Sequence, residues 1–186
     1  MEQVVDLWTK AQELHLDGKF DEAENLYVRL LEQNHGNAGL LATLGSLYLQ
    51  KNRCGLAIHF LEAAVAKGLK PSDVLTNLGL SYKKTGQNKI AKSYFEQSIK
   101  DDPSPGALAN YSGMFIESGE SAKCIELCES AIKADPSLAT AHWNLAISLL
   151  GEGQWARAWD EHEWGLKTHG VREDRAVLDV PVWDGK

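Results

Sequence analysis

The stretch Ala139–Leu166, ATAHWNLAISLLGEGQWARAWDEHEWGL, decides the fold of this 186-residue chain. Within it, Leu145 is followed by the small residue Ala146, and this order returns every 33 or 34 residues toward the N-terminus. The earlier members are Tyr111-Ser112, Leu78-Gly79, Leu44-Gly45 and Lys10-Ala11. A period of this length indicates stacked structural repeats, in which each unit buries its apolar face against its neighbours.

Each period contains two apolar stripes with helical spacing, separated by a turn. In the first period Leu7, Ala11 and Leu14 form one stripe at i, i+4 and i+7. Gly18 then interrupts the pattern as a residue that is free to take a positive φ. The equivalent turn positions are Asn52, Gly86, Gly119 and Gly153. The pattern predicts five helix-turn-helix units at residues 4–37, 38–71, 72–104, 105–138 and 139–172.

Small residues recur at fixed places in both helices of each unit. The second helices carry Ala23, Ala57, Ala91, Cys124 and Ala158 at equivalent positions. Two antiparallel helices approach closely only where one side chain is small, so we expect each of these residues to lie at a helix contact. Larger residues, such as Tyr48 and Phe95, are expected to fill the space between neighbouring helices.

The third unit resembles the tetratricopeptide repeat. It contains Leu78-Gly79, Tyr82, Gly86, Ala91, Phe95 and Pro103 in the order that is typical of this 34-residue motif. The resemblance implies an all-α, right-handed α-solenoid of about five repeats over residues 1–172, followed by a capping or linker tail at residues 173–186. It also implies that the first helix of each unit lines a concave groove.

Asparagines recur at one position of the first helices, directly before the Leu or Tyr of each unit. Thr9, Thr43, Asn77, Asn110 and Asn144 occupy this position. A carboxamide has one acceptor and two donor hydrogens, so it can bind both polar groups of an extended peptide main chain. A similar asparagine ladder is found in the repeats of protein O-linked N-acetylglucosamine transferase. The other interpretation is that these asparagines contact a neighbouring helix, and both stay open.

The rest of the expected groove offers few charged groups. Lys83 and Lys84 lie near its middle, which is too few basic residues for a clamp that binds carboxylates. Trp143 and Trp8 are expected either to stack on a ligand side chain or to pack against a neighbouring helix. The candidate peptide-binding residues are therefore the three asparagines together with Thr9, Thr43, Lys83 and Trp143.

The C-terminal segment resembles a different context. Glu163-Trp164 followed by Pro181-Val182-Trp183-Asp184-Gly185 is similar to bacterial and phage proteins in which such repeats precede a glycosyltransferase-like domain. Gly165 departs from the arginine that is usual in that family. This resemblance makes a substrate-docking region of a glycosyltransferase-like enzyme an alternative function. The alternative role of the tail is to cover the exposed end of the last helix pair.

Composition and motifs exclude several functional classes. The net charge of −7 argues against broad nucleic-acid binding, which requires a basic patch. No signal peptide and no membrane helix is expected. Three cysteines, Cys54, Cys124 and Cys128, are expected to be free, which fits a reducing cytoplasm. The sequence contains no HExxH, GxGxxG or GxSxG motif, so we predict neither catalysis nor a metal or cofactor.

Three functional hypotheses follow. The chain is a non-catalytic scaffold that binds a protein or peptide in its groove, or the docking region of an enzyme, or a structural protein that self-assembles through its terminal repeats. The third hypothesis would use Trp155, Trp159 and Trp183 as contacts.

Overall fold

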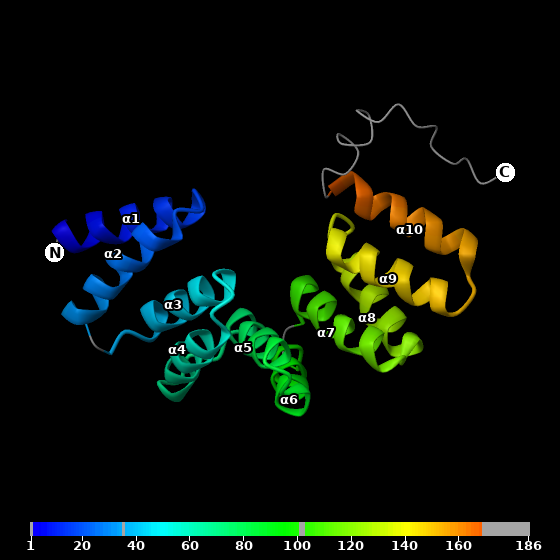
Figure 1. Cartoon of the computed structure of the whole chain (residues 1–186), viewed down its shortest axis with the longest axis horizontal. Coiled ribbons are helices and arrows are strands. Elements are labelled where there is room, and N and C mark those ends of the chain that lie inside the picture. The colour runs from blue at the N-terminus through cyan, green and yellow to red at the C-terminus, as the bar shows by residue number, and fades with distance from the viewer. Residues whose placement is uncertain (1, 35, 101–102, 169–186) are drawn as a thin grey trace. The chain divides into compact units, whose positions relative to one another are not determined.

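The computed structural model describes residues 2–34, 36–100 and 103–168, and this part of the chain is entirely α-helical, with ten helices (Figure 1). The side chains of residues 2–5 and 165–168 are outside the description. The chain divides into two compact units, residues 1–102 and residues 103–186, and each is described by itself. The expectation of one continuous solenoid over residues 1–172 stays a prediction.

The first unit contains three helical hairpins. They are α1 and α2, α3 and α4, and α5 and α6. Their bounds are α1 Glu2–Leu16, α2 Phe20–Gln33, α3 Ala38–Gln50, α4 Cys54–Ala66, α5 Ser72–Lys84 and α6 Asn88–Ser98. Each hairpin also packs on the next one, through α2 on α3 and α4 on α5, and the first helices α3 and α5 are in contact. The apolar core therefore runs through the unit as a series of interfaces.

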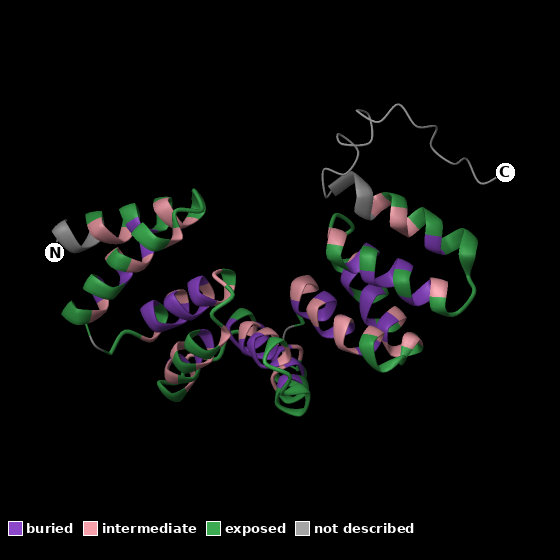
Figure 2. Cartoon of the chain, in the orientation of Figure 1, coloured by how far each residue is buried: buried purple, intermediate pink, exposed green. Residues whose placement is uncertain are grey.

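The second unit contains two hairpins of the same kind. The helices are α7 Pro105–Ser118, α8 Ser121–Ala134, α9 Ala139–Gly151 and α10 Trp155–Thr168. α9 packs against both α7 and α8, and α10 packs against α9. In Figure 2 the buried residues of α7, α8 and α9 are numerous, whereas the described part of α10 is mostly exposed. The core of this unit therefore centres on α9.

The five hairpin turns use the same backbone conformation. Gly18, Gly86, Gly119 and Gly153 have φ between 74° and 77°, and Asn52 takes φ 58° at the equivalent position. Glycine adopts this left-handed conformation without steric cost, and asparagine tolerates it better than most residues. The turn positions predicted from the 34-residue spacing are confirmed. The helices on either side consequently start and stop at equivalent positions in each hairpin.

Two glycines on first helices allow a second helix to approach closely. A Cβ atom on Gly45 would lie 2.5 Å from Cγ of Leu61, and one on Gly79 would lie 2.8 Å from the ring of Phe95. Leu61 and Phe95 are both fully buried. The small residues predicted at helix contacts are confirmed at these two places. Among the described residues, no helix combines the length and apolar character needed to cross a membrane.

Candidate functional site

The candidate asparagines lie on first helices, as the repeat pattern predicts. Asn77 is on α5 of the first unit, whereas Asn110 and Asn144 are on α7 and α9 of the second. The Nδ2 of Asn77 donates to Oγ of Ser46 on α3 at 2.9 Å. The Nδ2 of Asn144, which is only 8% exposed, donates to the carbonyl oxygen of Ala109 on α7 at 3.0 Å. These are contacts between first helices, and peptide binding by the asparagines stays a prediction.

Asn144 belongs to a buried polar network that joins three helices. Its Nδ2 also donates to Oγ of Ser112 at 3.0 Å, and this hydroxyl accepts a second hydrogen bond from Sγ of Cys128 at 3.2 Å. Cys124 lies one helical turn away, with its Sγ 3.9 Å from that of Cys128. Both cysteines are free thiols that are fully buried. The hydrogen bond with Cys124, together with burial, raises the pKa of Cys128, so this thiol stays protonated at neutral pH.

The remaining candidates have separate surroundings. Thr9 is exposed on α1, Lys83 and Asn110 are half-buried, and Nζ of Lys84 donates to Oδ1 of Asn52 at 3.1 Å. Trp8 is half-buried and packs against Tyr27 with a ring-centroid distance of 5.6 Å. Trp143 is 38% exposed, and its ring lies 5.4 Å from that of His162 on α10. Packing, the second interpretation for the tryptophans, thus describes Trp8 well.

A hollow of about 420 Å³ lies between α1, α2 and α3 of the first unit. This volume falls in the range of small-molecule binding pockets. Amide and hydroxyl groups mix there with apolar and aromatic side chains. The lining residues are Gln12, His15, Leu16, Gly18, Phe20, Tyr27, Thr43 and Gln50. Of the candidate residues, Thr43 lies in this hollow.

The repeat pattern of the sequence did not point to His15, Leu16 and Gln50 as site residues. One feature of the sequence could have indicated two of them. Leu16 and Gln50 are 34 residues apart, so they occupy equivalent positions in adjoining repeats. Leu16 is 88% exposed at the end of α1, which is unusual for a leucine beside a core. Leu16 adds exposed apolar surface to the rim of the hollow.

One wall of the hollow is fixed by His15. Its Nε2 lies 3.0 Å from Oε1 of Gln50, and its Nδ1 lies 3.5 Å from the hydroxyl of Tyr27. Because the Gln50 oxygen can only accept, the neutral ring with its proton on Nε2 satisfies both contacts. Burial raises the pKa of Tyr27, so its hydroxyl stays protonated at neutral pH. The His15 ring also contacts Phe20 edge-on, with a centroid distance of 5.7 Å.

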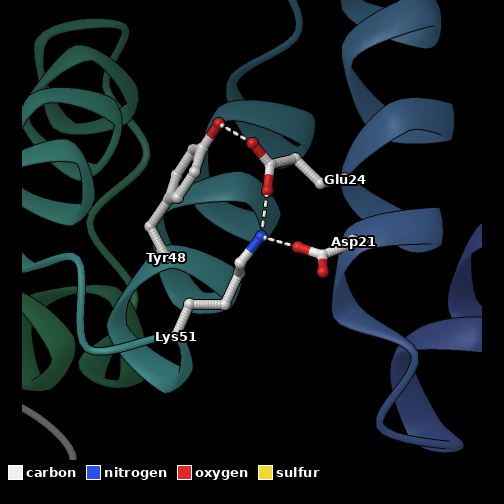
Figure 3. A network of polar contacts seen from close by, with 4 residues as sticks. All are labelled: Asp21, Glu24, Tyr48 and Lys51. Atoms are coloured by element: carbon white, nitrogen blue, oxygen red, sulfur yellow. Dashed lines mark hydrogen bonds and ion pairs between the residues drawn. The ribbon is translucent and has the colours of Figure 1, made fainter.

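A network of charged groups joins α2 to α3 beside the hollow (Figure 3). The Nζ of Lys51 forms ion pairs with Asp21, at 2.5 Å, and with Glu24. The Tyr48 hydroxyl donates to Oε1 of Glu24 at 2.8 Å. Because Phe20 and Tyr27 are on α2, and Thr43 and Gln50 are on α3, this network helps to hold both walls of the hollow in place.

The ion pairs change the pKa values of their members. The hydrogen bond and charge of Lys51 lower the pKa of Asp21, and the two carboxylates raise the pKa of Lys51. Burial alone would raise the pKa of Glu24, but the hydrogen bonds from Lys51 and Tyr48 outweigh it, and the pKa is lowered. All three groups are therefore charged over a wide range around neutral pH.

Chemistry of a metal centre is not indicated in the described part of the chain. No group of three or more His, Cys, Asp or Glu side chains is placed there to hold an ion. The predicted tail at residues 173–186 lies outside the described residues. It contains residues 181–185, which carry much of the resemblance to glycosyltransferase-linked repeats, and Trp183, one of the expected self-assembly contacts. These expectations stay predictions.

Comparison with protein families identifies the repeats. Tetratricopeptide repeat models match residues 11–74 and residues 72–105. Tetratricopeptide repeat protein 8 of Caenorhabditis elegans is 22% identical over 140 residues, which are 74% of this chain and 28% of that protein. The chain thus spans less than a third of the length of this curated relative. These matches confirm the tetratricopeptide repeats predicted from the third unit.

Solved structures agree in fold. PilW, described as a widely conserved type IV pilus biogenesis factor, matches with a TM-score of 0.78 and 15% identity, over 90% of this chain and 78% of that chain. YrrB, described as a repeat protein with an unusual peptide-binding site, matches with a TM-score of 0.63 and 18% identity, over 88% and 85%. At these identities the likeness shows the fold, and the predicted all-α solenoid class is confirmed.

Proposed function

Because the chain is built from tetratricopeptide repeats, a fold that generally serves as a scaffold for protein interactions, we propose that it is a non-catalytic scaffold that binds an extended peptide along its first helices. The hollow between α1, α2 and α3 carries this proposal. It receives one apolar side chain of the peptide. The polar groups around it hold the main chain of the peptide on either side.

The lining of the hollow fits this division of roles. Leu16 and Phe20 supply apolar surface for a side chain, and burying that surface favours binding. Gln12 and Thr43 lie on α1 and α3, so they flank the peptide from two helices. The Thr43 hydroxyl donates to the carbonyl oxygen of Gly39 at 3.0 Å, which leaves its oxygen as an acceptor for a peptide N–H. The carboxamide of Gln12 can both donate and accept.

The known peptide-binding repeat protein YrrB supports the proposal through its similar fold. The asparagines differ in how well they can test this proposal. Asn144 is committed to the core of the second unit, so its substitution would report on folding before it reported on binding. Half-buried Asn110 is the better test of a direct contact with peptide.

The first test uses peptides selected from a phage-displayed library of random dodecapeptides against the full chain. The selected peptide is synthesised, and its Kd is measured by calorimetry with wild type and with the double variant Gln12→Ala/Leu16→Ser. Both residues are exposed, so little loss of stability is expected. We expect Kd to rise at least about tenfold, which corresponds to about 1.4 kcal/mol of lost binding energy.

The matched control is Gln33→Ala/Leu56→Ser, which changes the same residue types at exposed positions outside the hollow. Its Kd should stay within about twofold of wild type. Far-UV circular dichroism checks that all variants keep their helix content. Equal Kd values for wild type and the hollow variant, or a library that yields no selected peptide, would refute this function.

A further inference from the structure

A second surface, on the last hairpin, is independent of the hollow. Five side chains of α9 and α10 form it, and we name it the aromatic end face: Trp143, Ile147, Trp155, Trp159 and His162. Their exposed fractions are high for large apolar residues: 38% for Trp143, 61% for Trp155 and 43% for Trp159. Monomeric proteins rarely leave so much aromatic surface together unless it is used for binding.

His162 joins the two helices of this face. Its ring lies 5.4 Å from Trp143 of α9, at an interplanar angle of 34°, and 5.4 Å from Trp159 of α10, at 84°. Ile147 follows Trp143 by one helical turn, and Trp155 precedes Trp159 by one turn. The rings of Trp143, His162 and Trp159 are therefore in contact with one another through His162, and large parts of the two tryptophans face solvent.

Four of the five equivalent positions one repeat earlier hold small residues. Subtracting 34 from each number gives Ala109, Gly113, Ser121, Ile125 and Cys128. Ala109 and Cys128 are almost fully buried, and α9 lies close enough for Asn144 to donate to the main chain of Ala109. Tryptophan and isoleucine at positions 143 and 147 would hold a further helix away from this distance.

The described charged groups around this face are mainly acidic. Glu163 lies one helical turn after Trp159, Asp160 follows Trp159 directly, and Glu152 is in the preceding turn, and all three are exposed. The nearby cation Arg157 forms an ion pair with Glu129 of α8. A cation placed over a tryptophan face is attracted by the ring, and carboxylates beside the ring strengthen this attraction. A second copy of this chain, with a net charge of −7, would bring further negative charge.

We propose that the aromatic end face docks a basic segment of a partner protein, in which arginine or lysine side chains alternate with apolar residues. The cations lie over the faces of Trp143 and Trp159 and near Asp160 and Glu163. The apolar residues contact Ile147 and Trp155. This surface and this partner chemistry are separate from the peptide-binding hollow of the first unit, so either proposal can fail alone.

The test uses three fluorescein-labelled nonapeptides made of Ala-Leu-Arg, Ala-Leu-Glu or Ala-Leu-Gln triplets. Anisotropy titrations with the full chain give their Kd values. We expect the arginine peptide to bind at least about tenfold more tightly than either other peptide. Its Kd should rise at least about tenfold in Trp143→Ala/Trp159→Ala, and about threefold or more in Asp160→Asn/Glu163→Gln. Added salt should weaken binding of the arginine peptide.

Matched controls lie in the first unit. Leu56→Ala removes exposed apolar surface from α4, and Glu22→Gln/Glu32→Gln makes the same change of net charge as the acidic pair variant. Both controls should bind the arginine peptide as wild type does. Unchanged binding in the two aromatic end face variants, or no preference for arginine over glutamine, overturns the proposal. Sedimentation that shows a wild-type dimer, lost in Trp143→Ala/Trp159→Ala, assigns the face to a second copy and also overturns it.

Discussion

At the residue scale, the closest helix contacts depend on the absence of a side chain. A Cβ atom on Gly79 would lie 2.8 Å from the ring of Phe95, which is closer than Cβ atoms come to other side chains in proteins. Phe95 is fully buried between α5 and α6, so its ring has little room to move. Gly55, by contrast, is on the exposed side of α4, and a Cβ there would meet no atom within 4 Å. The first unit therefore has no room for a side chain at Gly79 but has room for one at Gly55.

The substitution Gly79→Ala should destabilise the chain by about 1–3 kcal/mol, because the added methyl group overpacks a filled contact. Gly55→Ala should instead raise the free energy of unfolding by up to about 1 kcal/mol, since alanine favours the helical state more than glycine does. Urea unfolding followed by circular dichroism measures both values. A Gly79→Ala variant as stable as Gly55→Ala would show that the contact is not tight.

For single residues, the sequence predicts where a small side chain or a hydrogen-bonding group is required. It does not always predict which group is the hydrogen-bond partner. The glycine and small-residue positions could be predicted because close packing leaves a periodic trace. The role of Asn144 could not, since a carboxamide suits a peptide main chain and a helix carbonyl equally well. Only the position of the Ala109 carbonyl oxygen on another helix shows which group its amide contacts.

At the scale of elements, the junction of α2 and α3 depends on charge. Lys51, Asp21 and Glu24 form ion pairs there, and the Lys51 side chain is only 10% exposed. The helices themselves follow from local patterns, so their number and turns could be predicted. The hollow beside this junction could not, because it requires His15 and Gln50, 35 residues apart, to meet across two helices.

The substitution Lys51→Met should lower the midpoint of thermal unfolding at pH 7 by about 2–5 °C. The folded state lowers the pKa of Asp21 and Glu24 from their usual 3.8 and 4.5, so their stabilisation is present above these values and is lost as pH falls through the lowered ones. The raised pKa of Lys51 keeps its stabilisation below its usual 10.5, and this is lost as pH rises through the raised value.

Thermal scans at a series of pH values should therefore show the largest difference between wild type and Lys51→Met from about pH 5 to pH 10, narrowing at both ends. The control is Lys123→Met, which breaks an exposed pair with Glu126 in the second unit. We expect little change from it, because exposed ion pairs contribute little. A difference between wild type and Lys51→Met that is constant from pH 3 to pH 8 would contradict the role given to Asp21 and Glu24.

At the scale of the whole molecule, each of the two units is a series of hairpins, and within a unit each hairpin depends on its neighbour for part of its core. In such arrays stability is close to a sum of repeat and interface contributions, so parts of the chain can open before the rest. The thiols offer a way to observe this. Cys54 is half-exposed in the first unit, whereas Cys124 and Cys128 are fully buried in the second.

In a Cys54→Ser background, the two remaining thiols should react with a thiol reagent only when the second unit opens. Their reaction under native conditions should be slower than that of a free peptide cysteine by at least about a hundredfold, because local opening of a core is rare. Labelling across a urea series should follow the loss of helix signal. Rapid labelling of both thiols in the absence of urea would show that the network around Ser112 is accessible in the folded state.

The hydrogen bonds between first helices also determine how interchangeable the repeats are. The amide of Asn77 contacts the hydroxyl of Ser46, a group that only some residues possess. The amide of Asn144 contacts a main-chain oxygen at Ala109, which any residue would provide, although it also uses the Ser112 hydroxyl. If the repeat that carries Asn77 were moved, the repeat before it would need a hydroxyl at the position of Ser46. The repeat that carries Asn144 would accept a wider range of preceding repeats. Exchanging repeats in this chain therefore requires a matching hydrogen-bond partner in the preceding repeat as well as a matching shape.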